Sequence, residues 1–183
     1  MGNLIYNIAI SENTRYYCNG QMYNIWYNMI KRCYSGLNCY KTYIDCTVSE
    51  NWLKFENFAD WFKLNYVEGF ELDKDILFKG NKIYGPDTCC FVPRQINSLI
   101  LTNKSRRGLL PIGINQVGNK FVVRLTKYKK KQYIGTYLTI EEAFENYKFE
   151  KQKYIREIAD FWKEKISDNV YQSLINYQIE ITD

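Results

Sequence analysis

Cationic side chains are concentrated in one segment of this 183-residue chain. Residues 111–140 hold six basic residues and no acidic residue, whereas the net charge of the whole chain is only +5. A concentrated positive field favours the binding of a polyanion, because binding releases condensed counterions. A lysine-rich loop that only faces solvent is the alternative. The six residues are Lys120, Arg124, Lys127, Lys129, Lys130 and Lys131.

The cysteines could in principle bind a metal. The chain contains six of them, but no C-x-x-C pair and no histidine. Because structural zinc sites are built from such pairs or from mixed cysteine and histidine sets, we expect no zinc. In a reducing compartment the thiols are expected to serve as small buried hydrophobic groups. A metal site formed by Cys33, Cys39 and Cys46 is the alternative that stays open.

The composition is typical of a folded protein, with 46% hydrophobic, 17% aromatic and 25% charged residues. No stretch approaches the roughly 18 unbroken apolar residues of a membrane span. The first residues lack the basic and apolar regions of a signal peptide. We therefore expect a cytoplasmic, intracellular protein with no membrane partner. A phage-encoded protein in a bacterial host is compatible with this expectation.

Two helices are predicted in the first third of the chain. The first covers residues 21–34, where apolar residues recur at helical spacing. Ser49 is a plausible N-cap for the second helix, whose aromatic residues recur on one side and are expected to form core. The apolar residues of the second helix are Trp52, Phe55, Phe58, Ala59 and Phe62.

The next segment predicts the order strand, loop, strand, helix. Residues 70–78 and 88–92 read as extended, and the turn-rich residues 79–87 connect them. Pro93 suits the first turn of a helix that carries Ile96, Leu99 and Ile100 on one face.

The last third of the chain predicts a sheet packed on a long helix. Residues 111–115, 120–126 and 132–138 are three short extended runs, and in the middle run apolar residues alternate with polar and basic ones. Thr139 and Glu142 form a capping box at the start of the helix. The predicted fold class is therefore α+β, with a three-stranded antiparallel sheet backed by the helix and a short helix or tail after residue 168.

The run from Gly113 to Tyr147 resembles the apetala-two (ethylene-response-factor) DNA-binding domain. The matching pattern is G-I-x-x-x-x-x-K-F-V-V-R-L, followed by Y-I-G-T-Y-x-T-I-E-E-A-F-x-x-Y. In that family the sheet lies in the major groove of double-stranded DNA, and Gly135 matches the turn glycine.

The resemblance also assigns roles to the basic residues. It implies that Lys120 and Arg124, together with Lys127 and Thr136, lie on the exposed face that reads DNA. Three lysines of the predicted hairpin are expected to contact phosphate. Two arginines of the preceding basic hinge extend the DNA-binding set. These hairpin and hinge residues are Lys129, Lys130, Lys131, Arg106 and Arg107.

Residues 22–103 resemble the HNH, or His-Me finger, endonucleases of the phage and homing type. The motif is E-L-D-K-D-x8-Y-G-P-D-T-C-C-F-V-P-R-Q-I-N, preceded by W-x-x-M-I-x-R-C-Y and W-x-x-F-x-x-F. The resemblance implies a ββα-metal core that binds one Mg²⁺ or Mn²⁺ ion. By position Asp73 and Asn97 match the family's metal ligands, and Asp75 is only a reserve ligand, because strand alternation points it the same way but two residues further on.

The chain departs from these relatives because the usual catalytic base is a histidine and none is present. Lys74 occupies the adjoining position, where a cation suits stabilisation of the phosphate. Tyr84 is the remaining candidate for activating water. A tyrosine with its ordinary pKa near 10 is a poor base unless the metal or Lys74 lowers that pKa.

Together the two resemblances predict a DNA-binding, metal-dependent endonuclease. Its nuclease domain is expected at residues 1–108 and its DNA-binding domain at 109–183. A catalytically inactive, sequence-specific DNA-binding regulator is one alternative. A phage counter-defence inhibitor on the same scaffold is another, and the oligomeric state stays open.

Overall fold

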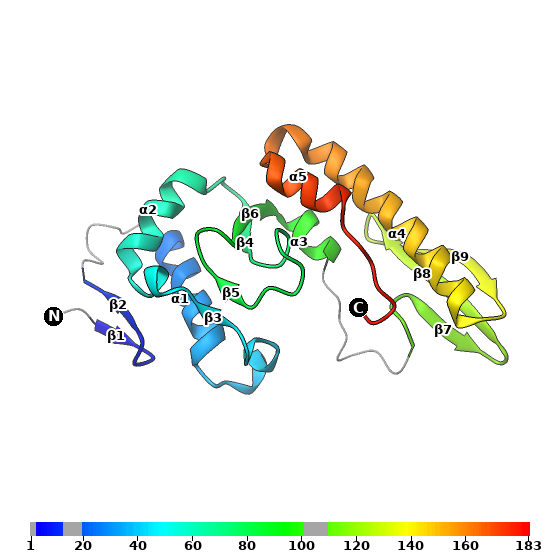
Figure 1. The fold of residues 1–183 in the computed structure, drawn as a ribbon, viewed down its shortest axis with the longest axis horizontal. Coiled ribbons are helices and arrows are strands. Elements are labelled where there is room, and N and C mark those ends of the chain that lie inside the picture. Colours follow the sequence, from blue (N-terminus) through cyan, green and yellow to red (C-terminus); the bar gives the residue numbers. More distant parts are fainter. Residues whose placement is uncertain (1–2, 13–19, 101–109) are drawn as a thin grey trace. The chain divides into compact units, whose positions relative to one another are not determined.

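The structure is a computed structural model that describes residues 3–12, 20–100 and 110–183. The chain divides into two compact units, Met1–Asn97 and Ser98–Asp183. Figure 1 labels the helices and strands of both units. The predicted domain boundary at residue 108 lies outside the described residues. The α+β class predicted from the sequence is confirmed.

The first unit begins with a short hairpin and three helical segments. β1 (Asn3–Ile5) pairs antiparallel with β2 (Ala9–Ser11), and α1 (Gly20–Tyr34) follows. The 3-10 helices η1 (Asn38–Tyr43) and η2 (Glu50–Leu53) flank strand β3 (Thr47–Val48). α2 (Phe55–Asn65) completes this part.

The prediction of one helix capped by Ser49 is wrong. Ser49 precedes the 3-10 helix η2, and within the described residues no backbone N–H donates to its hydroxyl. Lys54 adopts an extended backbone conformation (φ −94°, ψ 124°) and separates η2 from α2. The aromatic residues predicted to form core are nevertheless all buried in one hydrophobic cluster.

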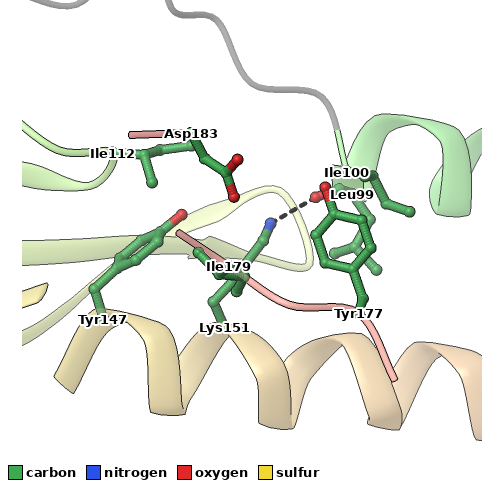
Figure 2. Close-up of a pocket in the computed structure, with 8 residues that line it drawn as sticks. All are labelled: Leu99, Ile100, Ile112, Tyr147, Lys151, Tyr177, Ile179 and Asp183. Carbon is green, nitrogen blue, oxygen red and sulfur yellow. Dashed lines mark hydrogen bonds between the residues drawn. The ribbon is translucent and has the colours of Figure 1, made fainter. Parts of the chain in front are cut away.

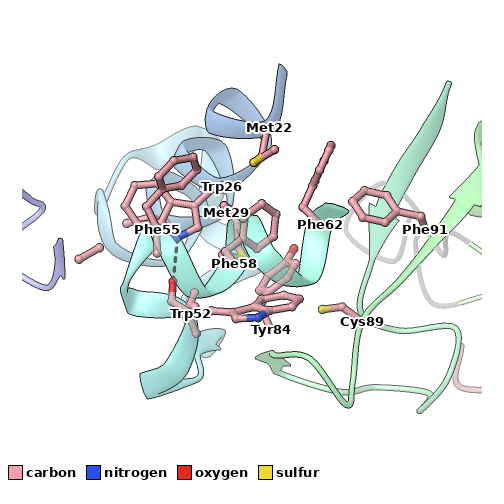
Figure 3. Packing of buried hydrophobic residues seen from close by; sticks show 14 of the residues in the cluster. Met22, Trp26, Met29, Trp52, Phe55, Phe58, Phe62, Tyr84, Cys89 and Phe91 are labelled. Carbon is pink, nitrogen blue, oxygen red and sulfur yellow. Dashed lines mark hydrogen bonds between the residues drawn. The ribbon is translucent and has the colours of Figure 1, made fainter. Parts of the chain in front are cut away.

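An aromatic core holds the first unit together. Trp26, Trp52, Phe55 and Phe58 are completely buried, and the indole N–H of Trp26 donates to the carbonyl of Trp52 at 2.7 Å (Figure 3). This bond ties α1 to η2 and satisfies a polar group that burial would otherwise penalise. The prediction that these aromatics form core is confirmed.

A small antiparallel pair and a helix follow α2. β4 (Phe70–Asp73) pairs with β6 (Cys90–Pro93), and α3 (Arg94–Ile100) begins directly after β6. β5 (Ile83–Tyr84) lies in the connection and pairs parallel with β3. The predicted order of strand, loop, strand and helix is present, with β5 as an unpredicted addition.

The first of these strands ends earlier than predicted. Oδ1 of Asp73 accepts hydrogen bonds of 2.7 Å from the backbone N–H groups of both Asp75 and Ile76. Such a carboxylate turn replaces the strand ladder, so the chain bends after Asp73. Phe70 and Leu72 pack against the aromatic core, and Glu71 and Asp73 therefore point to the opposite face of β4.

The second unit is the predicted sheet and long helix. β7 (Ile114–Val117), β8 (Lys120–Lys127) and β9 (Lys130–Tyr137) form an antiparallel sheet in the order β7-β8-β9. α4 (Ile140–Trp162) runs along one face of it (Figure 1). The 3-10 helix η4 (Lys163–Lys165) and α5 (Asp168–Ile175) complete the unit. Thr139 accepts the backbone N–H of Glu142 at 3.2 Å, which confirms the predicted cap.

We call the face of this sheet that packs against α4 the inner face. Ile114, Val123 and Leu125 of the sheet are buried there, and Ala143, Tyr147 and Ile155 are among the buried residues of α4. Burial of this kind is the main source of stability for a small α+β unit.

Two glycines allow close packing in the second unit. Gly113 has φ +77°, and a side chain there would collide with the ring of Tyr147. Gly135 is expected from the sequence to be a turn glycine, but it lies within β9 opposite Val123. The ring of Tyr137 occupies the space that a side chain at position 135 would need. This contact explains why glycine is required there, although the residue is not in a turn.

Candidate functional site

The face of the sheet turned away from α4, which we call the outer face, carries most of the predicted DNA-binding residues. Cross-strand partners lie on the same face of a sheet, so the register assigns each residue. Lys120 lies opposite Val117, and Arg124 lies opposite Tyr133. The outer face consists of Asn115, Val117, Lys120, Val122, Arg124, Thr126, Lys131, Tyr133 and Thr136.

The charge on this outer face has one sign. Lys120 and Lys131 are exposed, Arg124 is half-buried, and residues 111–140 contain no acidic side chain to neutralise them. Thr126, Thr136 and Asn115 add exposed hydroxyl and amide groups. The face can therefore offer several hydrogen-bond donors together with a positive field.

The prediction that Lys127 lies on the exposed face is wrong. Lys127 follows Leu125 by two positions and therefore shares its inner face. Its side chain is buried, with 8% exposure, and its ammonium lies 2.9 Å from Oε2 of Glu150 on α4. The ammonium also lies 5.8 Å from the centre of the Tyr154 ring. Lys127 holds the sheet to the helix and is not available to a ligand.

The predicted hairpin lysines do not act as one set. Tyr128 and Lys129 form the turn, with φ values of 50° and 63°. Lys130 and Lys131 instead begin β9. Lys131 pairs with Thr126 on the outer face, whereas Lys130 pairs with Lys127 and belongs to the other side. Arg106 and Arg107 of the predicted hinge lie outside the described residues.

Tyr133 and Val117 are not among the residues that the sequence predicts for the site, although both lie on the outer face. Their exposed fractions are 63% and 60%. The phenol oxygen of Tyr133 lies 2.9 Å from the hydroxyl oxygen of Thr136. Knowing which residues pair with Lys120 and Arg124 across the strands would have identified both. That pairing depends on a bulge between Val123 and Arg124, which the sequence does not reveal.

In the first unit, the predicted metal ligand Asp73 lies at the end of β4 on the face opposite the core. Burial raises the pKa of its carboxyl, and the two backbone N–H groups that donate to Oδ1 oppose this rise. Both of these hydrogen bonds end at Oδ1 of the carboxylate. Oδ2 is therefore the atom that a cation could approach.

Asn97 of α3 contacts a residue that sequence reasoning missed. Its amide Nδ2 donates to Oε2 of Glu71 at 2.7 Å. Glu71 lies two positions before Asp73 and on the same face of β4, and Nε of Arg94 is 3.8 Å from its Oε1. The amide thus lies beside the strand that carries Asp73, with Glu71 as its direct partner. The signal that could have found Glu71 is its spacing from Asp73.

Lys74 and Asp75 are bound to each other. The ammonium of Lys74, which is 6% exposed as a residue, donates at 2.8 Å to both carboxylate oxygens of Asp75 and at 2.7 Å to the carbonyl of Asn81. The prediction that Asp75 points the same way as Asp73 by strand alternation is wrong, because β4 ends at Asp73. The Lys74 ammonium is therefore buried and already bound by Asp75 and Asn81, which does not favour it as a cation that stabilises phosphate.

The geometry does not favour Tyr84 as a base. Tyr84 is 3% exposed and packs in the aromatic core (Figure 3). Burial raises the pKa of its hydroxyl, and the nearby Arg32 guanidinium offsets this only in part. A base for water needs a lower pKa and access to solvent, and Tyr84 has neither.

The cysteines follow their expected role only in part. Cys46 and Cys89 are buried, as expected, but Cys39 is exposed. Burial raises the pKa of the Cys89 thiol to about 12, so that it stays protonated. Among the described residues, no group of three or more His, Cys, Asp and Glu side chains is arranged to hold a metal ion.

A small pocket in the second unit surrounds a lysine. Lys151 of α4 donates from Nζ to the carbonyl of Leu99 at 2.7 Å, and Ile179, Tyr147 and Asp183 line the same pocket (Figure 2). Burial lowers the pKa of this ammonium to about 8. The bond satisfies a carbonyl in the last turn of α3, so the lysine has a structural partner.

No family model, curated protein or solved structure matches the chain. In the described part of the chain, none of the helices combines the length and the apolar character needed to cross a bilayer.

Proposed function

We propose that the second unit binds double-stranded DNA through the outer face of β7-β8-β9. The observation that carries this proposal is the gathering of Lys120, Arg124 and Lys131 on one face that has no acidic residue. The major groove of B-DNA is about 12 Å wide and admits β-strands. Arginine and lysine side chains bind the O6 and N7 atoms of guanine there, and threonine and lysine side chains bind phosphate.

The positions of the cations divide their roles. Lys120 and Arg124 lie on the central strand of the sheet, where a groove-bound sheet approaches the base edges most closely. Lys131 lies at the beginning of β9, and Lys129 lies in the adjacent turn. These peripheral lysines suit phosphate contacts, which position the protein without reading sequence. The resemblance of residues 113–147 to the apetala-two domain supports the proposal by analogy.

The test compares two double variants that remove equal charge. Lys120→Ala/Arg124→Ala should weaken binding of a labelled duplex by about 1 to 3 kcal/mol for each side chain that no longer reaches a base. Lys153→Ala/Arg156→Ala, on exposed positions of α4, is the matched control and should bind as wild type does. Affinities are measured by fluorescence anisotropy over a series of salt concentrations.

The salt dependence distinguishes DNA binding from an inhibitor that targets a protein. Each phosphate contact contributes about 0.9 to the slope of log K against log salt, so wild type should show a steep slope. Weak binding that is insensitive to salt, or an equal decrease in affinity for the two double variants, contradicts the proposal.

A second proposed function is metal-dependent phosphodiester hydrolysis by the first unit. The observation that favours it is the placement of Glu71, Asp73 and Asn97 on β4 and on α3, the helix that directly follows the β4–β6 pair. Carboxylate and amide oxygens are the ligands that Mg²⁺ and Mn²⁺ prefer. A bound ion would supply a Lewis acid and a water of lowered pKa, and Asp73 and Asn97 would hold it, with Glu71 in reserve.

Supercoiled plasmid with Mg²⁺ or Mn²⁺ tests this second proposal. Asp73→Asn keeps an oxygen that can accept the two backbone N–H bonds but removes the charge, so cleavage should fall at least about 100-fold while the fold is retained. Asp87→Asn, at an exposed position outside the site, is the control. If wild type binds DNA but leaves it intact from pH 7 to 10 with either metal, the hydrolase proposal fails and the inactive DNA-binding regulator stands.

A further inference from the structure

Two exposed apolar side chains accompany the cations of the outer face. Val117 and Tyr133 are 60% and 63% exposed, and each lies directly opposite a basic residue, Lys120 and Arg124 respectively. Single exposed apolar residues are common on protein surfaces. These two differ because they share one face with every proposed base-reading cation.

The polar end of Tyr133 is already engaged within the sheet. Its phenol oxygen lies 2.9 Å from the hydroxyl of Thr136, three positions along the same strand. The hydroxyl partner lies on the same outer face, and 63% of Tyr133 remains exposed beside this bond. The side chain of Val117 has no polar atom. Both positions therefore offer exposed hydrocarbon to a ligand.

The surroundings argue against a protein partner for these side chains. The core of a protein interface is a continuous apolar patch depleted of charged residues. Here Val117 and Tyr133 are on the two edge strands, and Lys120 and Arg124 lie between them on the central strand. Val122, the remaining apolar residue of the face, is only 9% exposed. Apolar contacts interleaved with cations fit a ligand whose own apolar groups are small and separated.

Duplex DNA has such groups in its major groove. The base edges there carry hydrogen-bonding atoms, and the apolar group is the C5-methyl of thymine. We infer, on the basis of the DNA-binding function proposed above, that Val117 and Tyr133 are contacts for thymine methyl groups on either side of the bases read by Lys120 and Arg124.

The register predicts the spacing of the two thymines. Val117 and Tyr133 are two strands apart, which is roughly 10 Å, and four positions apart along β8, which is roughly 13 Å. The diagonal is roughly 16 Å, which corresponds to about five base pairs at a rise of 3.4 Å. The recognised site should therefore contain two thymine positions about five base pairs apart.

Replacing thymidine by deoxyuridine tests the inference, because it removes the methyl group and keeps the Watson–Crick pairing. A duplex selected by the wild-type protein from a random library is synthesised again with deoxyuridine at each thymidine in turn and at all of them. Each contacted methyl should contribute about fourfold in affinity, so the fully substituted duplex should bind about 15-fold more weakly.

Protein variants separate direct contact from changes in DNA shape. The Val117→Ala variant should lose its sensitivity to deoxyuridine at one of the two thymidine positions and stay sensitive at the other. Tyr133→Ala should show the reverse pattern. Phe149→Ala, which removes a comparably exposed apolar side chain from α4, is the control and should keep both. Val117→Ser removes both methyl groups of the side chain and serves as the second variant if Val117→Ala lowers the melting temperature.

The possible results distinguish the inference from the function on which it rests. Absence of salt-dependent binding to any duplex overturns the proposed DNA-binding function and the inference with it. Equal affinity for thymidine and deoxyuridine duplexes overturns the inference and leaves DNA binding in place. Discrimination that persists unchanged in the Val117 and Tyr133 variants also overturns it, because the methyl effect then acts through the shape of the DNA.

Discussion

The ammonium of Lys127 lies 2.9 Å from Oε2 of Glu150, and this ion pair joins the sheet of the second unit to α4. The two side chains are only 10% and 28% exposed. The Lys127 ammonium therefore depends on the Glu150 carboxylate for its stabilisation, since little water reaches the lysine. One of the six cations that concentrate positive charge in residues 111–140 thus has a structural role.

Removing one partner of this pair should destabilise the protein. Lys127→Ala leaves the partly exposed Glu150 carboxylate without its cation and should lower the free energy of unfolding by about 1 to 3 kcal/mol. Lys130→Ala, at the exposed position opposite Lys127, should change it by less than about 0.5 kcal/mol. Urea denaturation followed by circular dichroism measures both. The double variant Lys127→Met/Glu150→Leu should recover most of the stability, and a double variant as unstable as Lys127→Ala contradicts the assignment.

Local patterns in the sequence predict much of the second unit. The alternation of Phe121, Val123 and Leu125 and the capping box of Thr139 are determined by neighbours in the chain, so the sheet, the long helix and its first residue all follow from the sequence. The wrong prediction that Lys127 is exposed could have been avoided by following the same alternation. A lysine is ordinarily expected to face solvent, although alternation after Leu125 places this one inside, where it finds Glu150, 23 residues later.

The first unit is harder to predict because its site depends on contacts between distant residues. The bond from Asn97 to Glu71 spans 26 residues, and Lys74 is held by Asn81 as well as by Asp75. Tyr84 is buried because β5 pairs with β3, a pairing of two residues per strand that carries no periodic signal. Motif spacing could place Asp73 and Asn97 on their elements, but it could not reveal these partners.

Gly113 should tolerate no side chain. Its φ of +77° disfavours L-residues, and an added Cβ would lie 2.8 Å from the carbonyl oxygen of Arg124 and closer still to the Tyr147 ring. Gly113→Ala should therefore lower the free energy of unfolding by about 3 kcal/mol or more. Gly118→Ala has a similar φ of +58° but open space around it, and should cost only about 1 kcal/mol. Equal destabilisation of the two variants in thermal melts would show that the ring contact is unimportant.

The turn after β4 should depend on a side-chain oxygen at residue 73. Asp73→Ala removes the acceptor of two backbone N–H bonds and should destabilise the protein by about 1 to 3 kcal/mol. Asp73→Asn retains an acceptor and should be destabilised by less than half of that amount. Chemical denaturation of both variants measures the difference. A ranking in which Asn is as damaging as Ala would assign the effect to the missing charge.

The pKa of Lys151 predicts a pH dependence of stability with a defined sign. Burial lowers this pKa from 10.5 to about 8 in the folded protein, whereas the unfolded chain keeps the ordinary value. Below pH 8 both states are protonated, and the folded state bears the full penalty of a buried charge. Between about pH 8 and 10.5 the folded state releases its proton first, so this contribution to stability improves as pH rises.

Lys151→Met isolates that contribution, because other titrating groups are common to both proteins. The free energy of unfolding of wild type minus that of Lys151→Met should increase between pH 7.5 and 10.5, by roughly 3 kcal/mol at most. Lys153→Met, at an exposed position on the same helix, should show no such trend. A difference that stays constant or falls over this range would mean that the ammonium in the folded state is stabilised by a carboxylate such as Asp183 rather than penalised by burial.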